Sequence, residues 1–174
     1  MPGAEAGATV RSMRGIAVVV ALLGVLAGSA GAAAPTPEPC KDLKLAQARA
    51  VLGQSAKLAE KQVVRQRVCT VKAGGSVALT VRSDSATDFD WVVAGLKENP
   101  DYVKQLKPIS VGDKGYSYDR YSVVNGKLTF ALRVLFFKAG ARIYSVEVPA
   151  RRLLTPAKHL TIARSVVSGA RKSG

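Results

Sequence analysis

The stretch RYSVVNGKLTFALRVLFFKAGARIYSVEV, residues 120–148, decides the fold. Asn125-Gly126 is the strongest two-residue hairpin signal in the chain, because a type I′ turn needs a positive φ at both central positions. Residues 128–136 then alternate, with an apolar side chain at every second position, and Ala139-Gly140 interrupts the pattern before residues 143–148 resume it. The stretch therefore predicts a three-stranded antiparallel meander with strands near 120–124, 128–136 and 143–148.

Two further strands are expected earlier in the chain. Residues 61–72 are rich in β-branched side chains, and residues 77–81 alternate between apolar and polar or small side chains. Ala73-Gly74-Gly75 separates the two runs, which predicts a hairpin. Residues 108–119 are rich in turn formers and are expected to be irregular.

Helices are expected on both sides of these strands. Asp42 is predicted to cap a helix over 43–52, the pair Thr87 and Asp90 a second over 88–98, and Thr155-Pro156 a closing helix, with a short helical piece near 101–106. Strands that follow one another through short turns form antiparallel sheets. The fold class predicted is therefore α+β, with an antiparallel sheet of about five strands and helices packed on one face.

The N-terminal residues have the layout of a secretory signal peptide. Arg11 and Arg14 precede an uncharged segment over 16–34, and Ala30-Gly31-Ala32 offers the small side chains that a signal peptidase accepts. The domains predicted are a signal peptide over 1–32, a Pro-rich linker over 33–39 and a single domain over 40–174. The alternative is an uncleaved signal that anchors the protein with this domain outside, because 19 residues can just cross a bilayer.

The predicted location is extracellular or in the cell envelope. Leu26-Ala27-Gly28-Ser29 looks like a bacterial lipobox whose cysteine has become serine, and a hydroxyl cannot carry the thioether lipid. We therefore expect a released protein. Cys40 and Cys69 are the only cysteines, and in an oxidising compartment such a pair predicts one disulfide.

The chain is strongly basic, with a formal net charge of +14. Without residues 1–32, 24 basic and 11 acidic side chains remain. This charge favours anionic partners such as a cell-wall polymer, lipid head groups or an envelope protein. Nucleic acid is not expected, because no recognised binding motif is present. The arginines inside the apolar alternations are expected on a solvated sheet face: Arg65, Arg67, Arg82, Arg133 and Arg142.

The sequence offers little for catalysis, and we expect no catalytic residue, no cofactor and no metal. His159 is the only histidine and is expected to be an exposed or half-buried helix residue. Asp84, Asp88 and Asp90 form an acidic cluster, but their spacing is not that of a calcium loop.

One group of side chains is a candidate for ligand contact: Tyr116, Tyr118, Arg120 and Tyr121. Tyrosine and arginine are favoured at binding surfaces. Packing of the tyrosines on an edge strand explains the same pattern.

Several landmarks follow one another in a characteristic order. Cys40 opens a helix that ends in Val51-Leu52-Gly53, Cys69 begins Cys-Thr-Val, Val111-Gly112-Asp113 precedes Tyr116, and a terminal helix follows Leu154-Thr155. This order resembles the actinobacterial secreted and lipoprotein domains of unknown function, which look related to the extracellular sensor domain of a mycobacterial receptor kinase. The resemblance spans about residues 39–170, and it implies an α+β cell-envelope module for binding or sensing. The chain departs from the group at Ser29 and in having a single cysteine pair.

The function expected from these observations is a non-enzymatic binding or sensing module outside the cytoplasm, directed at an anionic wall component or a partner protein. The alternative is a small secreted hydrolase or enzyme inhibitor. Two carboxylates converging in one cleft would favour the hydrolase.

Overall fold

The computed structural model describes residues 38–63, 66–84 and 88–172. The predicted signal peptide and most of the predicted linker lie outside the described residues. The helices and strands, in chain order, are α1 (Pro39–Asp42), α2 (Leu45–Leu52), β1 (Lys57–Val63), β2 (Gln66–Ala73), β3 (Ser76–Asp84), α3 (Phe89–Lys97), β4 (Val103–Pro108), β5 (Lys114–Val124), β6 (Lys127–Ala139), β7 (Arg142–Pro149), the short 3-10 helix η1 (Ala150–Arg152) and α4 (Pro156–Ala170). Among the described residues, no helix is long and apolar enough to cross a membrane.

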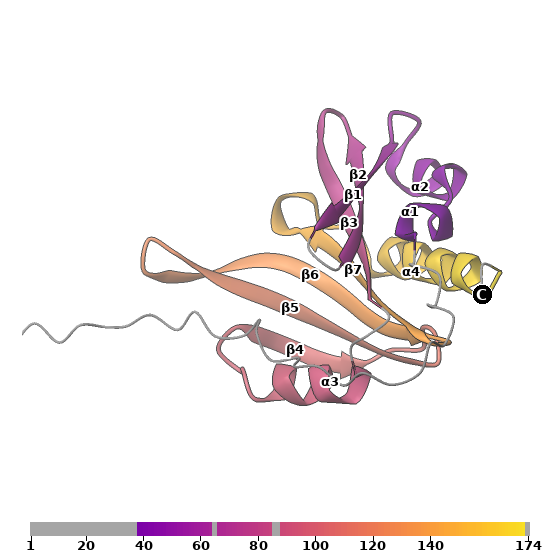
Figure 1. The fold of residues 1–174 in the computed structure, drawn as a ribbon. Coiled ribbons are helices and arrows are strands. Elements are labelled where there is room, and N and C mark those ends of the chain that lie inside the picture. Colours follow the sequence, from indigo (N-terminus) through magenta and orange to yellow (C-terminus); the bar gives the residue numbers. More distant parts are fainter. Residues whose placement is uncertain (1–37, 64–65, 85–87, 173–174) are drawn as a thin grey trace, which may run out of the picture. The chain divides into compact units, whose positions relative to one another are not determined.

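The strands form one antiparallel sheet in the order β1-β2-β3-β7-β6-β5-β4 (Figure 1). The α+β class and the antiparallel sheet are confirmed, but the sheet has seven strands instead of about five. The predicted meander is confirmed as β5, β6 and β7. Asn125 and Gly126 have φ values of 51° and 73°, as the turn between β5 and β6 requires.

Neither outer strand was predicted as a separate strand. Residues 61–63 of β1 were included in the single strand expected over 61–72, which the structure divides between β1 and β2. β1 is exposed at nearly every position, so it lacks the alternation that marks a half-buried strand. Residues 101–106 were expected to be helical, but β4 begins at Val103 and contains a bulge between Lys104 and Lys107. The expectation of an irregular segment up to residue 119 was also wrong, because β5 begins at Lys114.

Helices cover both faces of the sheet, which corrects the prediction of helices on one face. Leu135 and Phe137 of β6 belong to the main core, which α1, α2 and α4 cover. Val134 and Phe136 point to the opposite face, where they pack with Phe89 and Val93 of α3 in a second, smaller core. The physical reason is the uninterrupted apolar run over 134–137, which needs cover on both faces.

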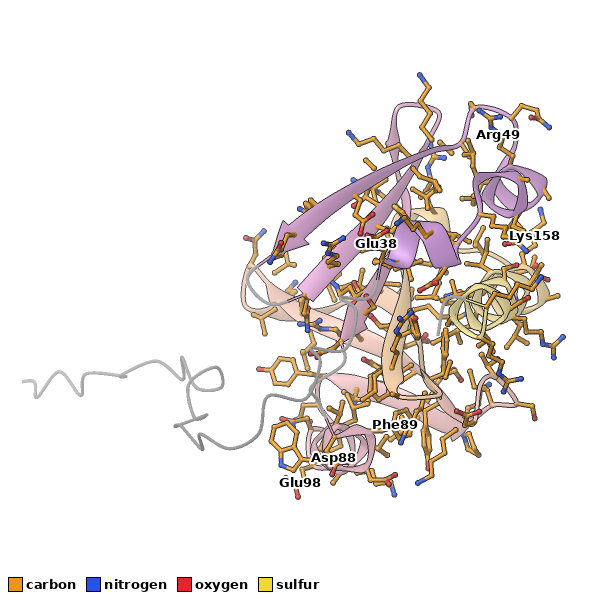
Figure 2. All side chains as sticks on the ribbon, turned by 45° about the vertical axis from the view of Figure 1, so that its right-hand side comes forward. Glu38, Arg49, Asp88, Phe89, Glu98 and Lys158 are labelled. Atoms are coloured by element: carbon orange, nitrogen blue, oxygen red, sulfur yellow. A yellow bond between two sulfur atoms is a disulfide. The ribbon has the colours of Figure 1, made fainter. Side chains whose placement is uncertain are left out.

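The two cores differ in how their helices are held. In the smaller core, the ring of Phe89 stacks on Phe136 with centroids 4.9 Å apart, and Phe89 lies between α3 and the sheet (Figure 2). In the main core, α4 approaches α1 so closely that a Cβ on Gly169 would lie 2.2 Å from the carbonyl oxygen of Asp42. Glycine at position 169 is therefore a condition of this packing.

Candidate functional site

The four residues singled out in the sequence do not share one surface. Tyr116 and Tyr118 are half-buried against the smaller core, and the ring of Tyr116 lies 6.3 Å from that of Phe89. Arg120 is exposed, whereas Tyr121 follows it on the opposite face and packs its ring 5.7 Å from Phe130. Packing thus accounts for Tyr116 and Tyr118. Ligand contact by these residues stays a prediction.

Burial also changes the acidity of one of these tyrosines. It raises the pKa of Tyr118 to about 12, and the nearby charge of Glu147 acts in the same direction. The phenol is therefore neutral at physiological pH.

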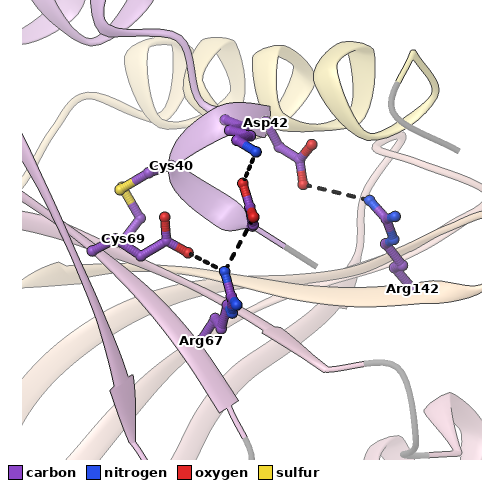
Figure 3. A network of polar contacts seen from close by, with 8 residues as sticks. Cys40, Asp42, Arg67, Cys69 and Arg142 are labelled. Carbon is purple, nitrogen blue, oxygen red and sulfur yellow. Dashed lines mark ion pairs between the residues drawn. A yellow bond between two sulfur atoms is a disulfide. The ribbon is translucent and has the colours of Figure 1, made fainter. Parts of the chain in front are cut away.

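The predicted disulfide is confirmed and lies beside a network of ion pairs (Figure 3). The Cys40–Cys69 bond joins α1 to β2. Nearby, Arg67 lies between Glu38, at 3.3 Å, and Glu60, at 3.7 Å. These contacts tie the beginning of the described chain to the first hairpin, so their role is structural.

Asp42 does not cap a helix, which corrects the prediction. Helix α1 ends at Asp42, and α2 begins only at Leu45, with Lys44 at the N-cap position. The Asp42 carboxylate is buried instead, where the Tyr144 hydroxyl donates to it at 2.8 Å and Arg142 lies 3.9 Å away. Burial and this hydrogen bond raise the pKa of Tyr144.

Four of the five sheet arginines form ion pairs, so they contribute little free positive charge to a solvated face. Arg67 pairs as described above, Arg82 pairs with Glu147, Arg133 with Asp119 and Arg142 with Asp42. Arg65 lies outside the described residues. The positive field of the protein therefore comes from other lysines and arginines.

Two members of the acidic cluster, Asp88 and Asp90, lie at the beginning of α3, whereas Asp84 is the last residue of β3. Asp88, and not Thr87 with Asp90, is the N-cap: its Oδ1 accepts from the backbone N–H groups of Asp90 and Trp91. Asp90 instead pairs with Lys114. Within the described ranges, no group of three or more His, Cys, Asp or Glu side chains is placed to hold a metal ion.

His159 is fully buried, which corrects the expectation of an exposed or half-buried residue. Its side chain lies under the first turns of α4, with 1% of the residue surface exposed. Nε2 donates to the carbonyl oxygen of Val146 at 3.0 Å, so the neutral ring keeps its proton on this nitrogen. Burial is the main cause that lowers the pKa of His159 to about 4, and the charge of Arg133 acts in the same direction. The ring is therefore neutral near pH 7.

A cavity of about 220 Å³ lies between the sheet and the first turns of α4. It is bordered by β4, β5 and β6 on the face of the main core. The lining residues are Gln105, Lys107, Ile109, Ser117, Tyr118, Asp119, Arg133, Leu135, Pro156, His159 and Leu160. Small-molecule sites typically combine an apolar wall with a few fixed polar groups, as this one does. We refer to it as the α4 cavity.

An oriented arginine is the main polar group of the α4 cavity. Arg133 donates from Nε to Asp119 Oδ1 at 2.8 Å and from Nη2 to Oδ2 at 3.1 Å. This two-point contact fixes the plane of the guanidinium and raises the pKa of Arg133. A guanidinium has five N–H groups, so three donors remain for a ligand.

The surroundings of Arg133 add further positive potential. Lys107 lies on β4 at the cavity, and the first turn of α4 contributes the partial positive charge of a helix N-terminus. Gln105 on the same strand has a φ of 55°, a backbone conformation that costs a non-glycine residue about 1 kcal/mol.

Most of this site was not predicted from the sequence. Tyr118 was a candidate for ligand contact and lines the cavity, but Arg133 was expected on a solvated sheet face, His159 as an exposed or half-buried helix residue, and residues 108–119 as irregular. The signal that could have revealed the site is the alternation of Ser117 and Asp119 with Tyr116 and Tyr118, which puts small and polar side chains on the main-core face of β5.

Comparisons with known proteins add no assignment. No protein-family model, no curated protein and no solved structure matches the chain.

Proposed function

We propose that the protein is a binding module of the cell exterior whose α4 cavity takes a compact anionic unit, such as a phosphate or carboxylate on a single sugar-sized body. A wall polymer that bears such units is the partner class that fits the charge of the chain. The observation that carries the proposal is the convergence of Arg133, Lys107 and the first turn of α4 on one cavity.

The electrostatics of the cavity favour an anion. Asp119 balances the charge of Arg133, and Lys107 has no counterpart among the other lining residues. The neutral ring of His159 adds no charge. A bound oxyanion would accept hydrogen bonds from the remaining guanidinium donors, and charge-assisted bonds of this kind are the strong ones.

The cavity gives less support to the hydrolase alternative. A pair of carboxylates would be needed for acid–base hydrolysis of a glycosidic bond. Asp119 is the single carboxylate among the lining residues, and both of its oxygens already accept from Arg133.

Removal of one positive charge at the cavity tests the proposal. Lys107→Gln should weaken binding of glycerol 3-phosphate and of purified cell walls about tenfold, because a hydrogen bond to a charged group is lost. Lys104→Gln is the matched control, since Lys104 is an exposed lysine of the same strand that does not line the cavity. The measurements are amide shift changes in NMR titrations with glycerol 3-phosphate and co-sedimentation with walls at low salt.

Two results would contradict the proposal. A protein that stays wholly in solution with walls at low salt would exclude the wall polymer. Equal weakening by the two lysine substitutions would show that the α4 cavity is not the site, and that only the general positive charge acts.

A further inference from the structure

The hairpin of β5 and β6 extends beyond the rest of the sheet as a two-stranded arm (Figure 1). β4 pairs with β5 only up to Arg120, and β7 pairs with β6 only from Leu132 onward. Residues 121–130 therefore pair only with each other among the described strands. We call them the arm. A bulge between Arg120 and Tyr121 marks its base, where it increases the twist of the hairpin.

Exposed apolar side chains are concentrated on the arm. Val123, Val124 and Leu128 expose 54%, 51% and 49% of their surface. Val123 and Leu128 are paired across the strands and share one face, whereas Val124 points to the other. Apolar surface on both faces of a ribbon gains nothing from the fold itself, so a binding role is its most direct explanation.

The two edges of the sheet are built differently. β1 carries Lys57, Glu60 and Lys61, and β4 carries lysines, a bulge and Pro108. Charges, bulges and prolines of this kind keep edge strands from pairing with other molecules. The arm has one charged side chain, Lys127, and no carboxylate.

Basic and aromatic side chains surround the base of the arm. Arg120 precedes it, and Arg151 lies on η1, which packs against β6. Tyr102 is exposed, and its carbonyl oxygen accepts from the backbone N–H of Tyr121. One exposed carboxylate, Asp101, lies next to Tyr102. Apolar side chains flanked by tyrosines and cations match the layers of an anionic bilayer surface.

We infer that the arm docks the protein on an anionic lipid surface. Val123, Val124 and Leu128 enter the interfacial layer, while Lys127 and Arg120 face the phosphates. The polar turn at Asn125-Gly126 keeps the arm in the headgroup region, because its backbone groups need polar partners. This surface is separate from the α4 cavity and does not depend on it.

A second copy of the chain fits the arm less well. A stable dimer buries about 800 Å² on each partner around an apolar centre, and the arm offers three exposed large apolar side chains that are divided between its two faces. A flat partner would also cover one face of the ribbon and leave the other exposed. Two copies with a net charge of +14 each repel one another.

A tryptophan reporter tests the inference on the full chain, because it senses the arm and not the other parts of the protein. Trp91 on α3 is the only tryptophan, and it is 66% exposed. The variant Trp91→Phe with Val124→Trp moves the reporter to the arm. With vesicles of phosphatidylcholine and phosphatidylglycerol, its emission should shift to the blue and be quenched by brominated lipid. Vesicles of phosphatidylcholine alone should give a smaller effect.

The controls separate the arm from general adsorption. The wild-type protein, with its reporter on α3, should show no such shift. Adding Lys127→Gln to the reporter variant should weaken vesicle binding about fivefold, as expected for one lysine at an anionic surface. Lys97 is an exposed lysine of α3, and adding Lys97→Gln to the reporter variant should leave vesicle binding unchanged. Equal melting temperatures confirm that the variants are folded.

The inference is overturned if anionic vesicles leave the emission of the tryptophan at position 124 unchanged. It is also overturned if the emission of Trp91 in the wild-type protein shifts to the blue by the same amount. It is also overturned if the two lysine substitutions act equally. If the position 124 emission depends on protein concentration without vesicles, and ultracentrifugation shows a dimer, the arm binds a second copy instead.

Discussion

At the scale of single residues, the structure buries a histidine in surroundings that disfavour its charged form. His159 is buried under α4, and its low pKa means that the folded protein binds the imidazole proton less readily than the unfolded chain does. Above pH 6.5 the ring is neutral in both states, so it makes no pH-dependent contribution. Below pH 6.5 the unfolded chain takes up the proton first, and the free energy of unfolding falls until about pH 4.

This linkage gives a measurable pH dependence. We expect the free energy of unfolding to drop by about 2 kcal/mol between pH 7 and pH 5 because of His159 alone. Urea denaturation at the two pH values measures it, and the chain has no other histidine to confuse the result. His159→Gln should be less stable at pH 7 but nearly insensitive to pH in this window. A wild-type protein whose stability is the same at pH 7 and pH 5 would contradict the buried neutral ring.

At the scale of elements, the close contact between α4 and α1 depends on Gly169, which has no side chain. Gly169→Ala should lower the free energy of unfolding by about 3 kcal/mol, because the new Cβ would overlap the backbone of Asp42. Gly95→Ala on α3 is the matched control. A Cβ there meets nothing within 4 Å, and the change should stabilise the helix by roughly 0.5 to 1 kcal/mol. Chemical denaturation of both variants checks the pair. Equal effects would show that α4 does not lie this close to α1.

Elements with strong local signals were predictable. The turn at Asn125-Gly126 and the cap at Thr155-Pro156 depend only on residues that are adjacent in the sequence. The structure confirms the hairpin and α4. β1 and β4 were not predictable in this way, because they are edge strands. Among the described strands, β1 pairs only with β2, the next strand in the chain, and its side chains are exposed at nearly every position, while β4 is interrupted by a bulge. Neither strand therefore has the alternating pattern that marks a half-buried strand.

At the scale of the whole molecule, the prediction of export remains to be tested on the protein itself. The chain recovered from culture medium is expected to begin at Ala33 and to be two hydrogens lighter than its reduced form, since signal peptidase removes residues 1–32 and the Cys40–Cys69 bond stays closed. Intact mass spectrometry of the medium and membrane fractions measures both. A full-length chain found only in membranes would establish the anchored alternative.

The candidate site shows why function was harder to predict than fold. Asp119 and Arg133 are separated along the sequence, and only the pairing of β5 with β6 makes them neighbours. The contact of His159 with Val146 depends on how α4 lies across the sheet. Each residue has an ordinary local context, so no motif marks the α4 cavity.

The sequence by itself determined the α+β class, the meander, the closing helix and the pairing of the two cysteines. These follow from side-chain alternation, turn residues, caps and cysteine number, all of which act locally or by composition. Only the tertiary structure decided that helices cover both faces, that four sheet arginines are neutralised, and that the α4 cavity and the arm exist. The reason is that burial and ion pairing are set by residues distant in the chain, whose meeting depends on strand order and helix placement.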